Sequence, residues 1–223
     1  MEAARYCGLD VPKTYLSRNN ETFIIERFDK VNDVLFGYED FTTLMKKGQE
    51  PDAKYKSSYE SLIRATFLYT NNRKEVEKVF SYIVFNCLIG NGDAHLKNFA
   101  IQYPPNMEQP FLSPIYDVTH TQIYAKKYGV IDTFMALKLG GSKSFPDNTR
   151  LMALGTFAQL SKDHTYEIIH STAQGILEYL DISNEVKEFE GLRKSIEESV
   201  YACTSTAYNP KGFTYDRYMK FPN

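Results

Sequence analysis

The spacing of apolar residues predicts a chain that is mostly helical. From Arg73 to Leu88 apolar side chains recur every three or four residues, as in an amphipathic helix that buries one face. Shorter helices are predicted at 2–7, with Gly8 just past the end, at Tyr38–Lys47 and at Tyr59–Leu68. Three C-terminal stripes also predict helices, and their members are Leu151, Leu154, Phe157 and Leu160; Ile168, Ile169, Ala173, Ile176, Leu177 and Leu180; and Val186, Phe189, Leu192, Ile196, Val200 and Cys203.

Strand patterns occur in two places. Pro12–Leu16 and Thr22–Phe28, separated by a short polar turn, predict a hairpin near the N-terminus. A second pair, Phe99–Tyr103 and Phe111–Tyr116, follows the long helix, and Asp117 closes its returning strand. The expected architecture is therefore a helical body with small antiparallel hairpins.

Composition narrows the possible partners and compartment. The chain has 26 basic and 28 acidic residues, so we expect no broad basic face and no direct contact with nucleic acid. Its three cysteines are widely spaced and form no C-x-x-C pair, which is typical of reduced thiols in a cytoplasmic protein. No apolar stretch is long enough to cross a membrane. The aromatic tail from residue 208 is expected to pack on the surface.

The loop after the long helix holds most of the reactive side chains. Asp93 and Asn98 lie five residues apart on it, and the strands that follow can bring Asn98 beside Asp117. Phosphoryl transfer needs a carboxylate that accepts the proton of the attacking hydroxyl, and oxygen ligands for the Mg²⁺ that bridges the ATP phosphates. Asp93 suits the first role, and Asn98 and Asp117 suit the second. His95 and Lys97 could place donors or positive charge near the phosphoryl group.

Other interpretations of these residues remain open. An Asp-x-x-x-x-Asn spacing is common by chance, and a polar loop after a helix is often only a solvated turn. A metal hydrolase using Asp93, His95 and His120 is a further alternative, although their spacing does not suggest a fixed metal cluster. His164 and His170 are interpreted as ordinary helix-surface or interface residues.

Four ordered segments resemble the HipA family of toxin kinases. The stretch LIGNGDAHLKNFAI, from residue 88, resembles the family's catalytic loop, and SPIYDV resembles its metal-binding Y-D-V, the counterpart of the kinase D-F-G. Upstream, GLDVPKTYL and FIIERFDK resemble the hairpin and hinge, and downstream MALKLGGSKSF resembles another family segment. The resemblance runs in order from about residue 1 to 160 and more loosely to the end.

The resemblance implies roles for individual positions. It implies Asp93 as the catalytic base and Asn98 and Asp117 as Mg²⁺ ligands. The implied ATP-binding positions are Glu26, Arg27, Phe28, His95, Lys97 and Asn98, the first three forming the adenine hinge largely through backbone groups. Without the resemblance, Phe28 would be interpreted as core and Glu26 as a surface charge.

The implied fold class is mainly α, within α+β: a protein-kinase-like C-lobe with small antiparallel β-hairpins, of the HipA C-terminal-domain type. Residues 1–36 would be the remnant of the nucleotide-binding lobe and hinge, and 37–223 the helical catalytic lobe. The implied function is an ATP-dependent serine/threonine protein kinase of a toxin–antitoxin system. Its implied partners are a protein substrate and a HipB-like DNA-binding antitoxin.

The chain departs from this family at one point. Complete members carry a phosphate-binding loop and a strand lysine before the hinge, whereas here only Gly8 and Lys13 precede it. The pair Gly140-Gly141 follows Asp117 and is interpreted as a strand turn. We therefore expect the chain to begin inside the nucleotide-binding lobe, to be weak or inactive alone, and to need the rest of that lobe, for example from a separate N-lobe protein.

Two other functions compete with this one. The segment from Gly92 to Asn98 also resembles the G-D-x-H-x-x-N loop of aminoglycoside and choline kinases, although those have His where this chain has Asn91. The second alternative is a non-catalytic module that only binds an antitoxin partner.

Overall fold

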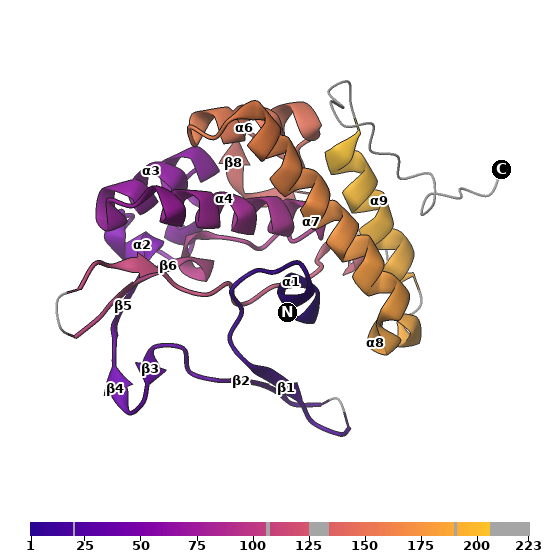
Figure 1. The fold of residues 1–223 in the computed structure, drawn as a ribbon, viewed down its shortest axis with the longest axis horizontal. Coiled ribbons are helices and arrows are strands. Elements are labelled where there is room, and N and C mark those ends of the chain that lie inside the picture. Colours follow the sequence, from indigo (N-terminus) through magenta and orange to yellow (C-terminus); the bar gives the residue numbers. More distant parts are fainter. Residues whose placement is uncertain (20, 106–107, 125–133, 190, 206–223) are drawn as a thin grey trace.

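The long helix predicted at Arg73–Leu88 is α4, which has these bounds and lies at the centre of the molecule (Figure 1). The computed structural model describes residues 1–19, 21–105, 108–124, 134–189 and 191–205. From Tyr82 to the end of α4 every residue is buried, so this half of the helix is buried around its whole circumference rather than on one face. It packs against α3 (Tyr59–Thr70), α6 (Asn148–Phe157), α7 (Lys162–Ile182) and α9 (Leu192–Thr204).

Side-chain caps fix where these helices begin. Asn72 accepts a 3.0 Å hydrogen bond from the backbone N–H of Lys74 at the start of α4. Such caps typically contribute about 1 kcal/mol each. Equivalent caps at α3, α6 and α7 are made by Ser58, Asp147 and Ser161. Two shorter helices lie near the ends of the described chain: α1 (Glu2–Tyr6), which packs on α7, and α8 (Asn184–Glu188), which precedes α9.

A three-stranded antiparallel sheet of order β5–β6–β7 carries the chain away from the loop that follows α4. The central strand is β6 (Ala100–Tyr103), and β5 (Gly37–Asp40) and β7 (Phe111–Leu112) flank it. The hairpin predicted after the long helix is thus confirmed, but its returning strand ends at Leu112. The prediction that Asp117 closes that strand is therefore wrong, because Asp117 lies five residues beyond β7.

The helix predicted at Tyr38–Lys47 is wrong in its first part. Tyr38 lies in β5, opposite Gln102 of β6, because pairing with a strand distant in sequence overrides the local pattern. The helix α2 (Phe41–Leu44) begins only after Asp40, whose carboxylate accepts hydrogen bonds of 2.7 and 3.1 Å from the next backbone N–H groups.

The N-terminal hairpin is confirmed with shorter strands. β1 (Thr14–Leu16) pairs antiparallel with β2 (Phe23–Ile25), and an unpredicted second hairpin joins β3 (Lys30–Val31) to β4 (Val34–Leu35). Both hairpins extend away from the helices (Figure 1). Their apolar side chains are exposed, namely Tyr15, Leu16, Phe23, Ile24, Ile25, Val31, Val34 and Leu35. An isolated two-stranded hairpin is only marginally stable in water, so this exposure is unusual.

The last hairpin joins β8 (Phe134–Leu139) to β9 (Ser142–Ser144). Its turn is formed by Gly140 and Gly141, both with positive φ, which confirms the predicted strand turn. The hairpin lies beside the short helix η1 (Ala53–Tyr55), because the Lys138 N–H donates a 3.2 Å hydrogen bond to the Ser57 carbonyl.

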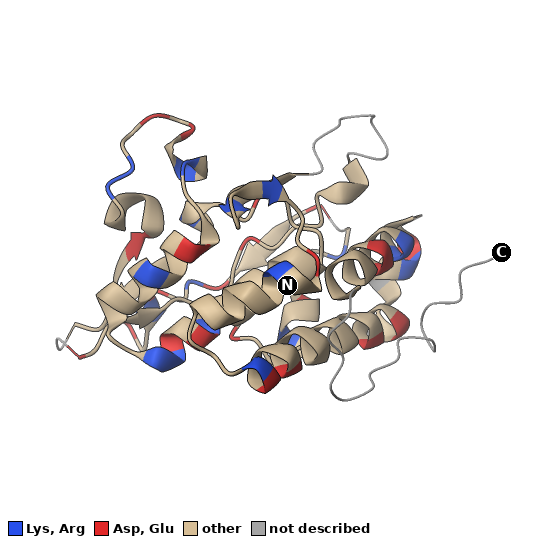
Figure 2. Cartoon of the chain, turned by 90° about the horizontal axis from the view of Figure 1, so that it is seen from above, with Lys and Arg blue, Asp and Glu red and all other residues tan. Residues whose placement is uncertain are grey.

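The distribution of charged residues and the hydropathy of the helices match what the amino-acid composition predicts. Basic and acidic residues are interspersed along the ribbon (Figure 2). Within the described part of the chain, no helix combines the length and apolarity that crossing a membrane requires. His164 is partly exposed and lies 3.0 Å from Glu77, as expected, whereas His170 is buried against Tyr166 and is not a surface residue. The aromatic tail lies outside the described residues.

Candidate active site

A chain of buried amides fixes the start of the candidate catalytic loop to α4. Asn86 donates 2.8 Å to the Tyr82 carbonyl, and Asn91 donates 2.8 Å to the Asn86 side-chain oxygen. The Asn91 oxygen then accepts a 3.0 Å hydrogen bond from the backbone N–H of Asp93. Sequence reasoning missed this role for Asn86 and Asn91. The available signal was a single amide within an otherwise apolar helix, since a buried amide needs partners.

The two glycines of this loop are required by close contacts. The Thr121 hydroxyl accepts 2.7 Å from the Gly92 N–H and donates 3.2 Å to the Gly90 carbonyl. A β-carbon on Gly92 would lie 2.7 Å from the Phe134 carbonyl oxygen and 2.8 Å from the Thr121 hydroxyl. Gly90 has φ +71°, a conformation that side chains disfavour. The loop is thereby locked to the segment after Asp117.

His120 supports the same loop from another side. One of its ring nitrogens lies 2.6 Å from the Ile89 carbonyl and the other 2.9 Å from the Ser195 hydroxyl of α9. Both nitrogens are therefore occupied by contacts that do not involve Asp93 or His95. No group of three potential metal ligands occurs among the described residues. The structure thus does not assemble the cluster that a hydrolase based on Asp93, His95 and His120 would need.

Asp93 lies at the surface with one oxygen already paired. Its side chain is 54% exposed, and its Oδ1 accepts a 3.0 Å hydrogen bond from the Tyr55 hydroxyl. The ring of His95 lies behind it, with Nε2 4.0 Å from the same oxygen and an edge-on contact with the Tyr55 ring. Burial lowers the pKa of His95, and the negative charge of Asp93 opposes that shift. His95 is therefore neutral at pH 7.

Asn98 and Asp117 meet, as predicted. The Asn98 amide donates a 2.5 Å hydrogen bond to Asp117 Oδ2, and its oxygen accepts 3.0 Å from the His95 N–H. Asn98 is buried, whereas Asp117 is exposed. Asp117 has φ +56°, which is uncommon for a residue other than glycine and occurs often at functional positions. His95 therefore joins Asp93 to the Asn98–Asp117 pair.

The Asn98–Asp117 pair has the chemistry of a magnesium site. Mg²⁺ prefers hard oxygen ligands and takes few from the protein, because phosphates and water supply the rest. Within the described chain, Asp117 Oδ1 has no hydrogen-bond donor, so that oxygen is available. The Asn98 oxygen has one partner, and an amide oxygen can accept a second. Asp117, with Asn98 beside it, could therefore hold the ion.

Tyr116 connects the site to Phe28 of the predicted hinge. Its hydroxyl donates 2.6 Å to the Lys97 carbonyl, so the 2.5 Å contact with Tyr38 must have Tyr38 as donor. Its ring stacks on Phe28 at 5.2 Å. Burial raises the pKa of Tyr116 far above its ordinary value, so the hydroxyl stays protonated. The resemblance includes Tyr116 in the Y-D-V motif, but the sequence did not predict these contacts, because the partners come from three separate segments.

The three residues predicted to form the adenine hinge differ in their surroundings. Phe28 is half-buried against Tyr116, and its carbonyl accepts 2.9 Å from the Gln102 side chain. Glu26 uses its N–H within the first hairpin, and the side chains of Glu26 and Arg27 are exposed. The structure therefore brings Phe28 next to the residue that precedes Asp117, but leaves the other two side chains at the surface.

The side chain of Lys97 is not brought into the cluster. The residue is exposed, and within the described part of the chain its ammonium contacts none of Asp93, Asn98 and Asp117. Its carbonyl, held by Tyr116, is the part of Lys97 that contributes to the geometry of the site.

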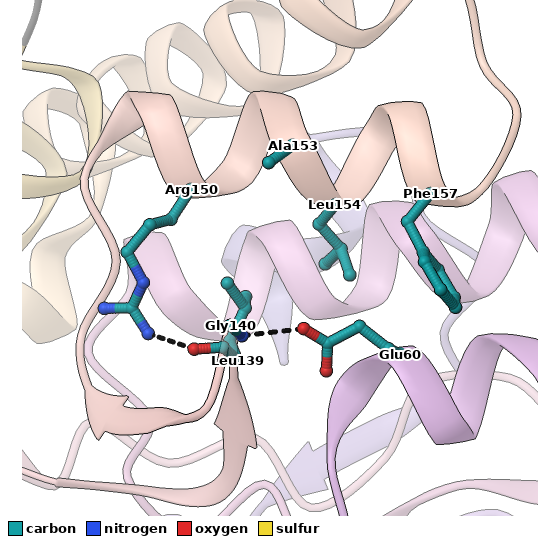
Figure 3. Close-up of a pocket in the computed structure, with 7 residues that line it drawn as sticks. All are labelled: Glu60, Leu139, Gly140, Arg150, Ala153, Leu154 and Phe157. Carbon is teal, nitrogen blue, oxygen red and sulfur yellow. Dashed lines mark hydrogen bonds between the residues drawn. The ribbon is translucent and has the colours of Figure 1, made fainter.

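A cavity of about 160 Å³ lies elsewhere, between α3, the β8–β9 hairpin and α6 (Figure 3). The Gly140 N–H donates 2.6 Å to Glu60 at its edge, and the Arg150 guanidinium donates to the Leu139 carbonyl. It is smaller than the roughly 300–1,000 Å³ of typical small-molecule sites. None of the candidate site residues lines it; the lining residues are Glu60, Leu139, Gly140, Arg150, Ala153, Leu154 and Phe157. The cavity therefore lies apart from the candidate site residues.

Comparison with solved structures defines the fold class. The HipA toxin in a Shewanella oneidensis complex of HipA, HipB and operator DNA matches with a TM-score of 0.70 at 17% identity. The match covers 91% of this chain and 54% of that one. The Helicobacter pylori proinflammatory kinase CtkA matches with a TM-score of 0.62 at 17% identity, covering 91% of this chain and 80% of that one. The predicted kinase-like α+β fold is thereby confirmed.

Comparison of sequences defines the family. Residues 1–180 match the HipA-like C-terminal domain, and the chain belongs to that family. Two Sinorhizobium fredii proteins named as candidate kinases are similar: Y4dM is 34% identical over 139 residues, and Y4mE is 27% identical over 207. These matches cover 56% and 83% of this chain, and 33% and 47% of the relatives.

A Haemophilus influenzae candidate kinase is 29% identical over 154 residues, and this match covers 62% of this chain and 44% of that protein. The chain thus spans between a third and a half of these relatives.

Proposed function

We propose that this chain is the catalytic lobe of an ATP-dependent serine/threonine protein kinase of the toxin–antitoxin type. The observation that carries the proposal is the single contact set in which His95 joins Asp93 to the Asn98–Asp117 pair. One carboxylate with a free oxygen stands beside a carboxylate–amide pair. Phosphoryl transfer uses a carboxylate to position the acceptor hydroxyl and metal ligands to neutralise charge on the phosphates, and these residues match both needs.

Asp93 would act as the general base. Its Oδ1 is held by the Tyr55 hydroxyl, and its Oδ2 has no donor within the described part of the chain. The acceptor hydroxyl would donate to Oδ2 and transfer its proton there as the oxygen attacks the γ-phosphorus of ATP and ADP leaves. A neutral His95 behind the carboxylate adds no positive charge that would weaken the base.

Asn98 and Asp117 would hold Mg²⁺, which when bound neutralises charge on the ATP phosphates. Asp117 has a left-handed backbone conformation, and its carboxylate accepts the hydrogen bond from the Asn98 amide. Tyr116 fixes this backbone to the loop and to Phe28 of the hinge. We infer that Glu26, Arg27 and Phe28 contact adenine, largely through backbone groups, and that His95 and Lys97 lie near the phosphates.

Residues 1–36 are proposed as part of the nucleotide-binding lobe, and 37–223 as the catalytic lobe. The exposed apolar side chains of the β1–β2 and β3–β4 hairpins support this division, because such strands need further strands or a cover. The missing phosphate-binding elements would come from a longer form of the polypeptide or from a separate N-lobe protein. Alone, the chain is expected to transfer phosphate weakly or not at all.

A HipB-like DNA-binding antitoxin is the proposed regulatory partner, since a HipA structure with this fold was solved with HipB and operator DNA. A non-catalytic binding module remains a second candidate function. The exposed apolar hairpins favour it, because they offer a surface for a partner whether or not chemistry occurs.

The nucleotide part of the proposal can be tested on the chain itself. Saturation-transfer NMR detects weak ligands, and it should show ATP binding that strengthens when Mg²⁺ is added. Asp117→Ala should abolish the Mg²⁺ effect, whereas Asp163→Asn, an exposed carboxylate on α7, should not. ATP binding that ignores Mg²⁺, or that is unchanged in Asp117→Ala, would contradict the assignment of Asp117. Absence of any ATP binding would favour the binding module.

A further inference from the structure

The surface beside Asp93, on the side of Tyr55, has a defined structure. The Tyr55 hydroxyl pairs with Asp93 Oδ1 at 3.0 Å, and the Tyr55 ring packs edge-on against His95 with ring centres 5.3 Å apart. Tyr55 is half-buried and belongs to η1, so its ring is a fixed platform next to the free oxygen of Asp93. A hydroxyl bound to that oxygen would have its neighbouring residues above this platform.

Two lysines flank the Tyr55 ring. The ammonium of Lys54 lies 5.0 Å from the ring centre, and that of Lys143 lies 5.8 Å from it. The two come from different parts of the chain, η1 and β9, which the contact between Lys138 and Ser57 holds together. Their convergence on one tyrosine is thus a product of the tertiary fold.

The charge of these lysines is uncompensated. Across the described residues, neither Lys54 nor Lys143 has a carboxylate within 4.0 Å, whereas the neighbouring Lys56 pairs with Asp52 at 2.9 Å. Unpaired ammonium groups beside a reaction centre favour anionic groups and repel cationic ones.

We propose that Lys54, Tyr55 and Lys143 form the surface that binds the substrate polypeptide next to its acceptor hydroxyl, and that they select acidic side chains there. The inference rests on the proposed kinase function, because it places the acceptor hydroxyl at Asp93. Adjacent residues of an extended peptide are spaced by about 3.3–3.6 Å. Residues one or two positions from the acceptor therefore lie within reach of both ammonium groups. The substrate class is a protein segment with Asp or Glu beside the phosphorylated residue.

The test is peptide binding without nucleotide. Fluorescence anisotropy at low ionic strength would compare a labelled peptide that has serine flanked by glutamates with the same peptide flanked by lysines. Two ion pairs at an exposed surface predict roughly tenfold tighter binding of the acidic peptide. The double variant Lys54→Glu with Lys143→Glu should remove or reverse that preference. Equal binding of both peptides to the unmodified chain would overturn the proposal.

The matched control changes the net charge identically elsewhere. Lys162→Glu with Lys194→Glu alters two exposed helical lysines, and it should leave the preference for the acidic peptide within about twofold of the original. A loss as large as in the first variant would show a long-range charge effect and would overturn the proposal. Circular dichroism should show that both variants fold, since all four lysines lie at or near the surface.

Two further measurements separate the possible failures. If MgATP displaces the acidic peptide, the lysines bind nucleotide phosphates and the peptide surface is refuted; unchanged peptide binding with MgATP supports it. The peptide measurement needs no catalysis, so it stands even if Asp93 proves inessential for phosphate transfer. Conversely, phosphate transfer that depends on Asp93 but shows no preference for acidic peptides would refute only this surface.

Discussion

The buried amide chain from α4 to Asp93 makes a quantitative prediction. Asn91→Ala removes the acceptor of the Asp93 N–H and the donor to the Asn86 oxygen. Asn91 is 2% exposed, so water does not readily replace these partners. A lost hydrogen bond costs about 1 kcal/mol, and an unsatisfied buried group costs about 1–3 kcal/mol. We expect the free energy of unfolding to fall by about 2–4 kcal/mol, equivalent to a melting temperature roughly 5–15 °C lower.

The assay is urea unfolding followed by circular dichroism, applied to Asn91→Ala, Asn86→Ala and the double variant. Because the two side chains share one 2.8 Å hydrogen bond, the double variant should be less destabilised than the sum of the singles, by about 1 kcal/mol. Additivity within about 0.4 kcal/mol would show that the two amides act independently. A cost below about 0.5 kcal/mol for Asn91→Ala would refute the reasoning, because such values are typical of exposed positions.

Three further outcomes follow from the structure. Tyr116→Phe keeps the ring stacked on Phe28 but leaves the Lys97 carbonyl without its donor, and it should lower the free energy of unfolding by about 1–2 kcal/mol in urea. Tyr38→Phe should cost less, because the hydrogen bond from Tyr116 to the Lys97 carbonyl remains. Gly92→Ala should lower the free energy of unfolding by about 2 kcal/mol or more, because the new β-carbon would collide with the Phe134 carbonyl oxygen. Gly141→Ala has open space around it and should lower the free energy of unfolding by only about 1 kcal/mol, through backbone strain. Equal losses for the two variants would contradict the packing of the loop. Burial lowers the pKa of His170 to about 4, so between pH 6.5 and pH 4 the unfolded chain binds more protons than the folded one. The stability present above pH 6.5 should therefore be lost as the pH falls, by up to about 3 kcal/mol. Urea unfolding across this pH range should show a shallower decline of the free energy of unfolding for His170→Phe than for the unmodified chain.

The sequence was most informative where a local pattern decides the structure. The bounds of α4 follow from its helical spacing and the glycine that comes after it, and they are confirmed. Asn98 and Asp117 meet as expected, because the hairpin between them brings its two ends together. The burial of α4 on all sides was underestimated, since the spacing of one helix says little about how many neighbours surround it.

Other features depend on contacts between distant segments. Tyr55 reaches Asp93 across 38 residues, and Tyr116 receives partners from the hinge, β5 and the loop. No short-range periodicity predicts contacts between such distant segments, so the contacts of both tyrosines were missed, although Tyr116 belongs to the Y-D-V motif. The error at Tyr38 has the same origin, because a strand partner in β6 overrides the local helical preference. The roles assigned to the site residues stay predictions until chemistry is measured.

The most direct measurement is transfer of the γ-phosphate of radiolabelled ATP. The chain would be assayed alone and together with a polypeptide that carries the proposed phosphate-binding elements, joined to it or added separately. We expect little transfer by the chain alone, and transfer to serine or threonine by the completed protein. Asp93→Asn should reduce the rate by about a hundredfold or more, with ATP binding and the melting temperature unchanged. Transfer that persists undiminished in a folded Asp93→Asn protein would contradict the assignment of Asp93 as the base.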